Sequence, residues 1–105
     1  MEGEIRMSSH DFFLLEPCKS ANGVEIKLRG LEIDLSTAES VLSKEGQTLL
    51  SGVVLIANLS KYNLTLYKSG RIMVKSEEKV TTSKIRPFAN KIIKVLKDNG
   101  ALVKL

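Results

Sequence analysis

The stretch from Asn63 to Lys75 constrains the fold of this chain most strongly. Apolar and polar side chains alternate on both sides of Lys68-Ser69-Gly70, which is typical of two strands joined by a tight turn. Alternate side chains point to opposite faces of a sheet, so this hairpin has one apolar and one more polar face. The apolar face consists of Leu64, Leu66, Ile72 and Val74, and the opposite face of Thr65, Tyr67, Arg71, Met73 and Lys75.

Two further strands are predicted before this hairpin. Val24–Arg29 alternates almost without a break, so Val24, Ile26 and Leu28 would face the core, and Glu25, Lys27 and Arg29 would share the polar side. The apolar run Val53–Ala57 predicts another strand, which residues 58–63 would connect to the hairpin.

An apolar run also lies near the N-terminus. Phe12-Phe13-Leu14-Leu15 is stopped by Glu16-Pro17. Because proline cannot donate to a strand ladder, this run predicts an edge strand or a plug beneath the sheet.

Two segments have the patterns of helices. Ser36-Thr37-Ala38-Glu39 has the spacing of a capping box, which predicts a short helix that begins at Ser36 and ends where Gly46 takes the left-handed conformation. A longer helix would be capped by Thr82 or Ser83, because Pro87 is tolerated only in a first turn, and would end at Asn99-Gly100. Its apolar stripe would pack on the sheet, and Lys91, Lys94 and Lys97 would lie on the solvated side.

In chain order the elements are β-α-β-β-β-α, with room for an extra N-terminal strand. Their faces predict an α+β fold, in which two helices cover one face of a curved antiparallel sheet and leave the other face open. We expect residues 1–10 to be a flexible N-terminal segment and residues 11–105 to form one domain. Residues 101–105 would add a strand or pack against the rest.

Composition narrows the classes of function. The net charge of +4 over 105 residues mildly favours polyanionic partners. The longest apolar run is too short to cross a membrane, and the first residues lack a signal-peptide pattern, so we expect a cytoplasmic protein without a membrane partner. The single cysteine (Cys18) and single histidine (His10) have no neighbours that would make a catalytic or metal site. We therefore expect no enzymatic activity, no metal and no cofactor.

Three phrases follow one another in the order of the predicted elements: Ile33-Asp34-Leu35 at the first helix, Gly52-Val53-Val54 at the start of the second strand, and Tyr67–Val74 across the last hairpin. With this order of elements, residues 24–100 resemble one repeat of the TATA-box-binding protein family. The resemblance implies a half-saddle whose sheet binds DNA. Since a saddle needs two repeats, it also implies a homodimer.

The chain departs from that family at the DNA-binding face. Members of the family bind the minor groove with an apolar sheet and insert side-chain wedges between base pairs. The wedge positions of the repeat would fall here on Leu50 and Tyr67, and the first strand would present Glu25 among its cations. A glutamate that faces phosphates is unfavourable, so the resemblance does not settle the activity.

Two functions follow from an open sheet face. The first is a non-enzymatic nucleic-acid-binding (DNA-binding) module, in which cations contact phosphates while a ring and a thioether contact bases or sugars. Its contact residues would be Lys27, Arg29, Tyr67, Arg71, Met73 and Lys75. The alternative is a protein-interaction or assembly module, in which a second subunit covers the same face. Its contact residues would be Val54, Ile56, Tyr67 and Met73.

Overall fold

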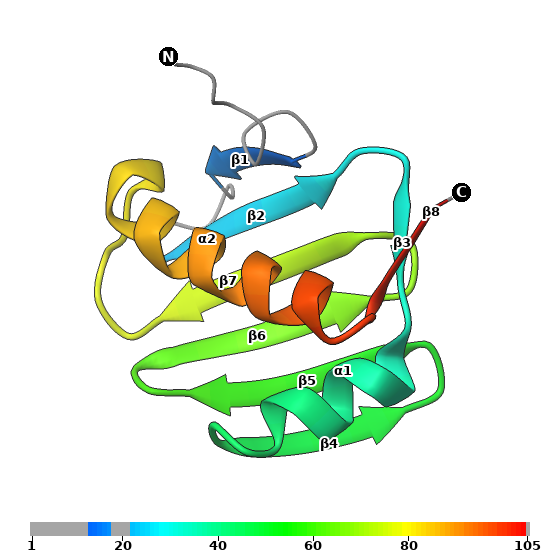
Figure 1. Cartoon of the computed structure of the whole chain (residues 1–105). Coiled ribbons are helices and arrows are strands. Elements are labelled where there is room, and N and C mark those ends of the chain that lie inside the picture. Colours follow the sequence, from blue (N-terminus) through cyan, green and yellow to red (C-terminus); the bar gives the residue numbers. More distant parts are fainter. Residues whose placement is uncertain (1–12, 18–21, 105) are drawn as a thin grey trace.

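A computed structural model describes residues 13–17 and 22–104 of the chain. Six of the strands form one antiparallel sheet in the order β1-β2-β7-β6-β5-β4, and β3 and β8 form a separate pair. Both helices lie on the same face of the large sheet (Figure 1). The elements are β1 (Phe13–Pro17), β2 (Gly23–Leu28), β3 (Leu31–Ile33), α1 (Leu35–Leu42), β4 (Gln47–Ser51), β5 (Val54–Leu59), β6 (Tyr62–Tyr67), β7 (Arg71–Ser76), α2 (Thr82–Asp98) and β8 (Leu102–Lys104). The predicted α+β fold is confirmed.

The core lies between the large sheet and the two helices. The inward side chains of the strands alternate with outward ones, as the sequence pattern predicts. The sheet contributes Phe13, Val24, Ile26, Leu28, Leu55, Ala57, Leu59, Leu64, Leu66, Ile72 and Val74, and the helices contribute Leu35, Ala38, Leu42, Ile85, Ala89, Ile92, Ile93 and Leu96. Because this layer is apolar throughout, the helices are fixed on one side of the sheet.

The N-terminal strand is an edge strand. Phe13–Pro17 pairs antiparallel with β2, and Phe13 is buried in the core. Of the two alternatives for this run, the structure shows the edge strand for residues 13–17, whereas Phe12 and the predicted flexible segment 1–10 lie outside the described residues. Because β1 lies within the sheet, residues 13–17 do not cover the opposite face.

Four strands, rather than the predicted three, follow α1. The prediction missed β4, and it placed Gly52 and Val53 at the start of a strand. In the structure these two residues form the turn between β4 and β5, with Gly52 at φ 60°. The next turn is also tighter than predicted, because β5 and β6 extend to Leu59 and Tyr62 and leave only Ser60 and Lys61 between them.

The predicted capping residues of both helices were wrong. Asp34 caps α1, and its carboxylate accepts a hydrogen bond from the backbone N–H of Thr37 at 3.2 Å, so the Ser36 box is not used. Thr81 caps α2 in place of Thr82 or Ser83, which puts Pro87 in the second turn, where its side chain is exposed. Gly46 does not take the left-handed conformation, and its role is a close approach to β5.

The small β3–β8 sheet closes one end of the molecule. Leu31, Glu32 and Ile33 pair with Lys104, Val103 and Leu102, respectively. The backbone N–H of Asp34 also donates to the carbonyl of Ala101 at 2.7 Å. The last residues of the chain are thereby tied to the segment that leads into α1, as Figure 1 shows at the right of the molecule.

Candidate functional site

The face of the large sheet opposite the helices is the candidate site, and we call it the open face. No element in the described part of the chain covers it. Its side chains come from every strand of the large sheet. They are Leu14 and Glu16 of β1, Glu25 and Lys27 of β2, Arg71, Met73 and Lys75 of β7, Asn63, Thr65 and Tyr67 of β6, Val54, Ile56 and Asn58 of β5, and Gln47, Leu49 and Ser51 of β4.

Strand register divides the open face into two halves of different chemistry. The central row of paired residues starts with Leu49 on β4 and Ile56 on β5, and passes through Thr65 and Met73 to Glu25 on β2. Along this row the β4 end is apolar and the β2 end is charged. We call these the apolar half (Leu49, Val54, Ile56) and the charged half (Glu16, Glu25, Lys27, Arg71).

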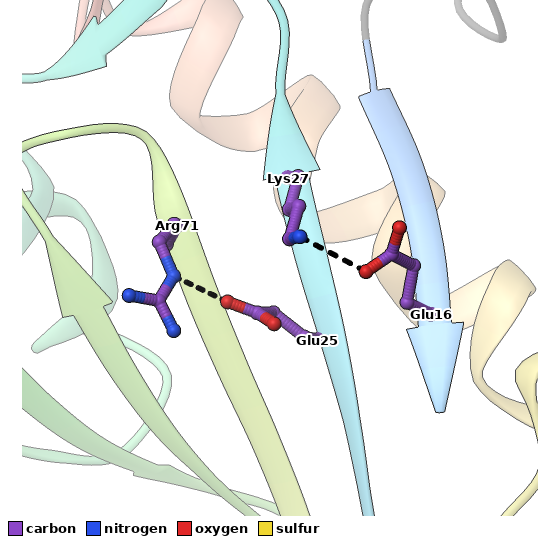
Figure 2. A network of polar contacts seen from close by, with 4 residues as sticks. All are labelled: Glu16, Glu25, Lys27 and Arg71. Carbon is purple, nitrogen blue, oxygen red and sulfur yellow. Dashed lines mark hydrogen bonds and ion pairs between the residues drawn. The ribbon is translucent and has the colours of Figure 1, made fainter. Parts of the chain in front are cut away.

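The charged half consists of two ion pairs across neighbouring strands (Figure 2). The ammonium of Lys27 lies 3.0 Å from a carboxylate oxygen of Glu16, and the guanidinium of Arg71 is paired with the carboxylate of Glu25. The hydrogen bond to Glu16 and its negative charge raise the pKa of Lys27 above its usual value of 10.5. Two of the cations expected to contact phosphates are thus already neutralised within the chain.

Tyr67 lies between the two halves. Its backbone pairs with Val54 of the apolar half, and the guanidinium carbon of Arg71 lies 5.4 Å from the centre of its ring. This distance is within the range of a cation–π contact. The ring is half-buried and still reachable from the open face. Arg71 therefore contacts an acid on one side and an aromatic ring on the other.

The apolar half is exposed next to the edge of the sheet. Leu49 and Ile56 are cross-strand neighbours, and their exposed fractions are 61% and 36%. Among the described strands, β4 has a neighbour on one side only. Its sequence, Gln-Thr-Leu-Leu-Ser, contains no charge and no proline. The opposite edge strand, β1, carries Glu16 and Pro17.

Five of the six residues predicted to contact nucleic acid share the open face: Lys27, Tyr67, Arg71, Met73 and Lys75. Arg29 does not, because β2 ends at Leu28 and Arg29 lies in the following bend. The wedge position expected at Leu50 is also wrong. Leu50 pairs with buried Leu55 and packs against the core, so Leu49 is the β4 leucine on the open face.

Sequence reasoning missed Leu49 as a contact residue. Leu49 and Leu50 are both apolar, although Leu49 points outward and Leu50 inward. The sequence of β4 therefore does not show the alternation of apolar and polar residues that reveals a strand. The signal that could have found it is Gly52, since a glycine followed by one residue between two apolar segments is typical of a two-residue hairpin turn. Recognition of that turn places Leu49 opposite Ile56 and therefore on the open face.

The described residues contain no group of three or more His, Cys, Asp or Glu side chains that could hold a metal ion. None of the helices in residues 13–17 and 22–104 is long and apolar enough to cross a membrane. Cys18 and His10 lie outside the described residues.

Comparison with known proteins found no matching family model, no similar curated protein and no similar solved structure. The resemblance to the TATA-box-binding protein family therefore stays a prediction.

Proposed function

We propose that this protein is a non-enzymatic assembly module, which forms a homodimer by pairing its β4 edge with β4 of a second copy. The observation that supports this most strongly is the uncharged β4 edge beside the exposed side chain of Leu49. An edge strand presents a row of backbone N–H and C=O groups that can pair with another chain. Proteins usually block such an edge with charge or proline, as the sequence of β1 does and that of β4 does not.

Twofold symmetry fits the sequence of β4. In an antiparallel pair centred on Leu49, this residue lies opposite Leu49 of the partner subunit, and Gln47 lies opposite Ser51. Such pairing joins two six-stranded sheets into one. It also brings the apolar halves of both copies together, so that each leucine loses part of its contact with water.

Charge favours the β4 edge over the rest of the surface for self-association. The chain has a net charge of +4, so two copies repel one another at most approaches. Because β4 carries no charged side chain, no like charges oppose one another along the paired edge.

The test is the oligomeric state measured by light scattering and sedimentation over a hundredfold range of protein concentration. We expect a dimer in the wild type and a monomer in Leu49→Lys, because an edge lysine blocks strand pairing. Leu14→Lys is the matched control. Leu14 is also an outward leucine of an edge strand, with an exposed fraction of 39%, but it lies on β1, so this variant should dimerise. A wild type that is monomeric throughout, or a Leu14→Lys variant that is equally disrupted, contradicts the proposal.

Nucleic-acid binding by the open face is the second candidate. It is supported by Tyr67, Met73 and three cations on neighbouring strands of one face. The ion pairs to Glu16 and Glu25 count against it, because phosphates must compete with these carboxylates. A fluorescence titration with a labelled duplex and a labelled single strand at two salt concentrations tests it. Glu25→Gln should tighten binding and Lys75→Gln should weaken it, whereas an absence of binding at low salt excludes this function.

A further inference from the structure

Two asparagines of the chain are followed directly by glycine, Asn22 by Gly23 and Asn99 by Gly100. The side chain of an asparagine can react with the backbone nitrogen of the next residue, and glycine favours this because it has no side chain to hinder ring closure. The two sites share this chemistry, but they lie in different backbone surroundings.

The reaction needs only the chain itself and water. The glycine nitrogen attacks Cγ of the asparagine, so that an N–Cγ bond forms and the Cγ–Nδ2 bond breaks. The hydrogen of the glycine nitrogen leaves with the amide group as ammonia. Water then opens the cyclic imide at either of its two carbonyl groups, and the product is aspartate or isoaspartate.

The end of α2 protects Asn99 from this reaction. Its side-chain Nδ2 donates to the carbonyl of Val95 at 2.8 Å, which directs the amide back along the helix. The backbone N–H of Gly100 is the attacking group, and it donates to the carbonyl of Lys97 at 3.1 Å. Both hydrogen bonds must open before the ring can close, so reaction at Asn99 requires the helix end to unfold locally.

Asn22 lies at the exposed start of β2 and is held less firmly. Its Nδ2 donates to the carbonyl of Glu77 at 3.4 Å, which is long for a hydrogen bond. Its carbonyl accepts from the backbone N–H of Ser76 at 3.0 Å. Since hydrogen-bonded and non-hydrogen-bonded pairs alternate along an antiparallel ladder, the next pair, Gly23 with Lys75, exchanges no hydrogen bonds. The β7 strand therefore does not hold the attacking nitrogen.

Gly23 also lies beyond the described pairs on the other side of β2. The last described pair of the β1–β2 ladder joins Pro17 to Val24, so Gly23 is one residue outside it. The ends of ladders open locally at a low cost in free energy. Because Gly23 is buried, the water that takes up its proton reaches it during such openings, and the reaction is slow.

We propose that Asn22 is a site of slow self-modification, which converts it to aspartate or isoaspartate in the folded protein while Asn99 stays intact. Either product replaces the amide that donates to Glu77 by a carboxylate, and lowers the net charge by one unit. Isoaspartate also leads the main chain through Cγ, which displaces the carbonyl that accepts from Ser76. The site is independent of the proposed dimerisation, because it does not include β4.

Prolonged incubation of the full chain at mildly alkaline pH, followed by proteolysis and mass spectrometry of the peptides, tests this site. In the folded protein we expect Asn22 to react at least about tenfold faster than Asn99, because local structure protects Asn99. In strong denaturant the two sites should react at similar rates. If Asn22 stays intact in the folded protein but reacts in denaturant, the proposal is overturned. Equal rates in the folded protein overturn the protection assigned to the end of α2.

Two variants separate this reaction from other sources of acidic protein. Asn22→Gln should remove the acidic species that ion-exchange chromatography detects, because glutamine must close a larger ring and reacts much more slowly. Asn99→Gln is the matched control and should form this species as the wild type does. Both side chains are exposed, so the fold should persist, and circular dichroism checks this. An acidic species that persists in Asn22→Gln, or that is lost in Asn99→Gln, contradicts the assignment.

Discussion

A β-carbon added to Gly46 would lie 2.1 Å from the carbonyl oxygen of Asn58. Gly46 follows α1, and its backbone N–H donates to the carbonyl of Leu42 at 3.2 Å. The chain that leaves the helix can therefore enter β4 only by passing directly against the backbone of β5.

Gly46→Ala should destabilise the protein, because the atom in the way belongs to a backbone that is fixed in a strand ladder. We expect a loss of about 1 to 3 kcal/mol in the free energy of unfolding, as for other overpacking substitutions. Chemical denaturation measures it. Lys44→Ala, at an exposed position two residues earlier, should change stability by less than about 0.5 kcal/mol. Equal stability of the two variants would contradict the steric argument.

The cap of α1 should make stability depend on pH in the acid range. The hydrogen bond from the backbone N–H of Thr37 lowers the pKa of Asp34 below its usual 3.8. A lowered pKa in the folded state means that this stabilisation is complete above pH 3.8 and is lost as the pH falls through the folded-state pKa.

Asp34→Ala should therefore melt a few degrees below the wild type at neutral pH, and the difference should disappear at the lowest pH at which the protein stays folded. Asp34→Asn is the control, since asparagine caps a helix without titrating in this range. Thermal melts from neutral pH down to the acid limit measure this. A difference in melting temperature between Asp34→Ala and the wild type that stays constant with pH would refute the assignment.

Ser60→Gly should stabilise the protein. It occupies the turn between β5 and β6 with φ 56°, a left-handed conformation that costs an L-residue about 1 to 2 kcal/mol. Glycine removes this strain and loses roughly 0.5 to 1 kcal/mol in chain entropy, so we expect Ser60→Gly to gain about 0.5 kcal/mol. Ser51→Gly, at a β4 position, should lose stability in the same denaturation experiment. A destabilised Ser60→Gly variant would show that the turn is not strained.

The pair of Glu25 and Arg71 should be coupled energetically. Their exposed fractions are 15% and 51%, so solvent screens the pair only in part. A double-mutant cycle of Glu25→Gln and Arg71→Gln should give a coupling free energy of about 1 kcal/mol at low salt, and less at high salt. Additive effects of the two substitutions would mean that the pair does not contribute.

The sequence predicted which side chains share a face of the sheet, but it did not predict which strands lie side by side. Strict alternation places Leu66 inward and Tyr67 outward in any antiparallel sheet, and the structure agrees. The pairing of Glu25 with Arg71, which are 46 positions apart in the sequence, requires β2 to lie beside β7. Period-two patterns contain no information about this non-local choice. The sequence therefore did not reveal that Arg71, which was expected to contact phosphates, is paired with Glu25.

The helix starts were mispredicted for a different reason. Ser36 and Asp34 can both cap a helix, and the glutamate three residues after Ser36 favours the serine by local rules. The structure uses Asp34 because the pairing of β3 with β8 fixes the chain up to Ile33. A tertiary contact thus decided between two local signals of similar strength.

The hydrogen bond between Asp34 and Ala101 has a consequence for the order of folding. It joins residues that are far apart in the sequence, so it closes a long loop, whereas β4, β5, β6 and β7 are joined in sequence by short hairpin turns. Because closing a long loop costs more chain entropy, we expect these hairpins to form first and the β3–β8 end of the molecule to close last.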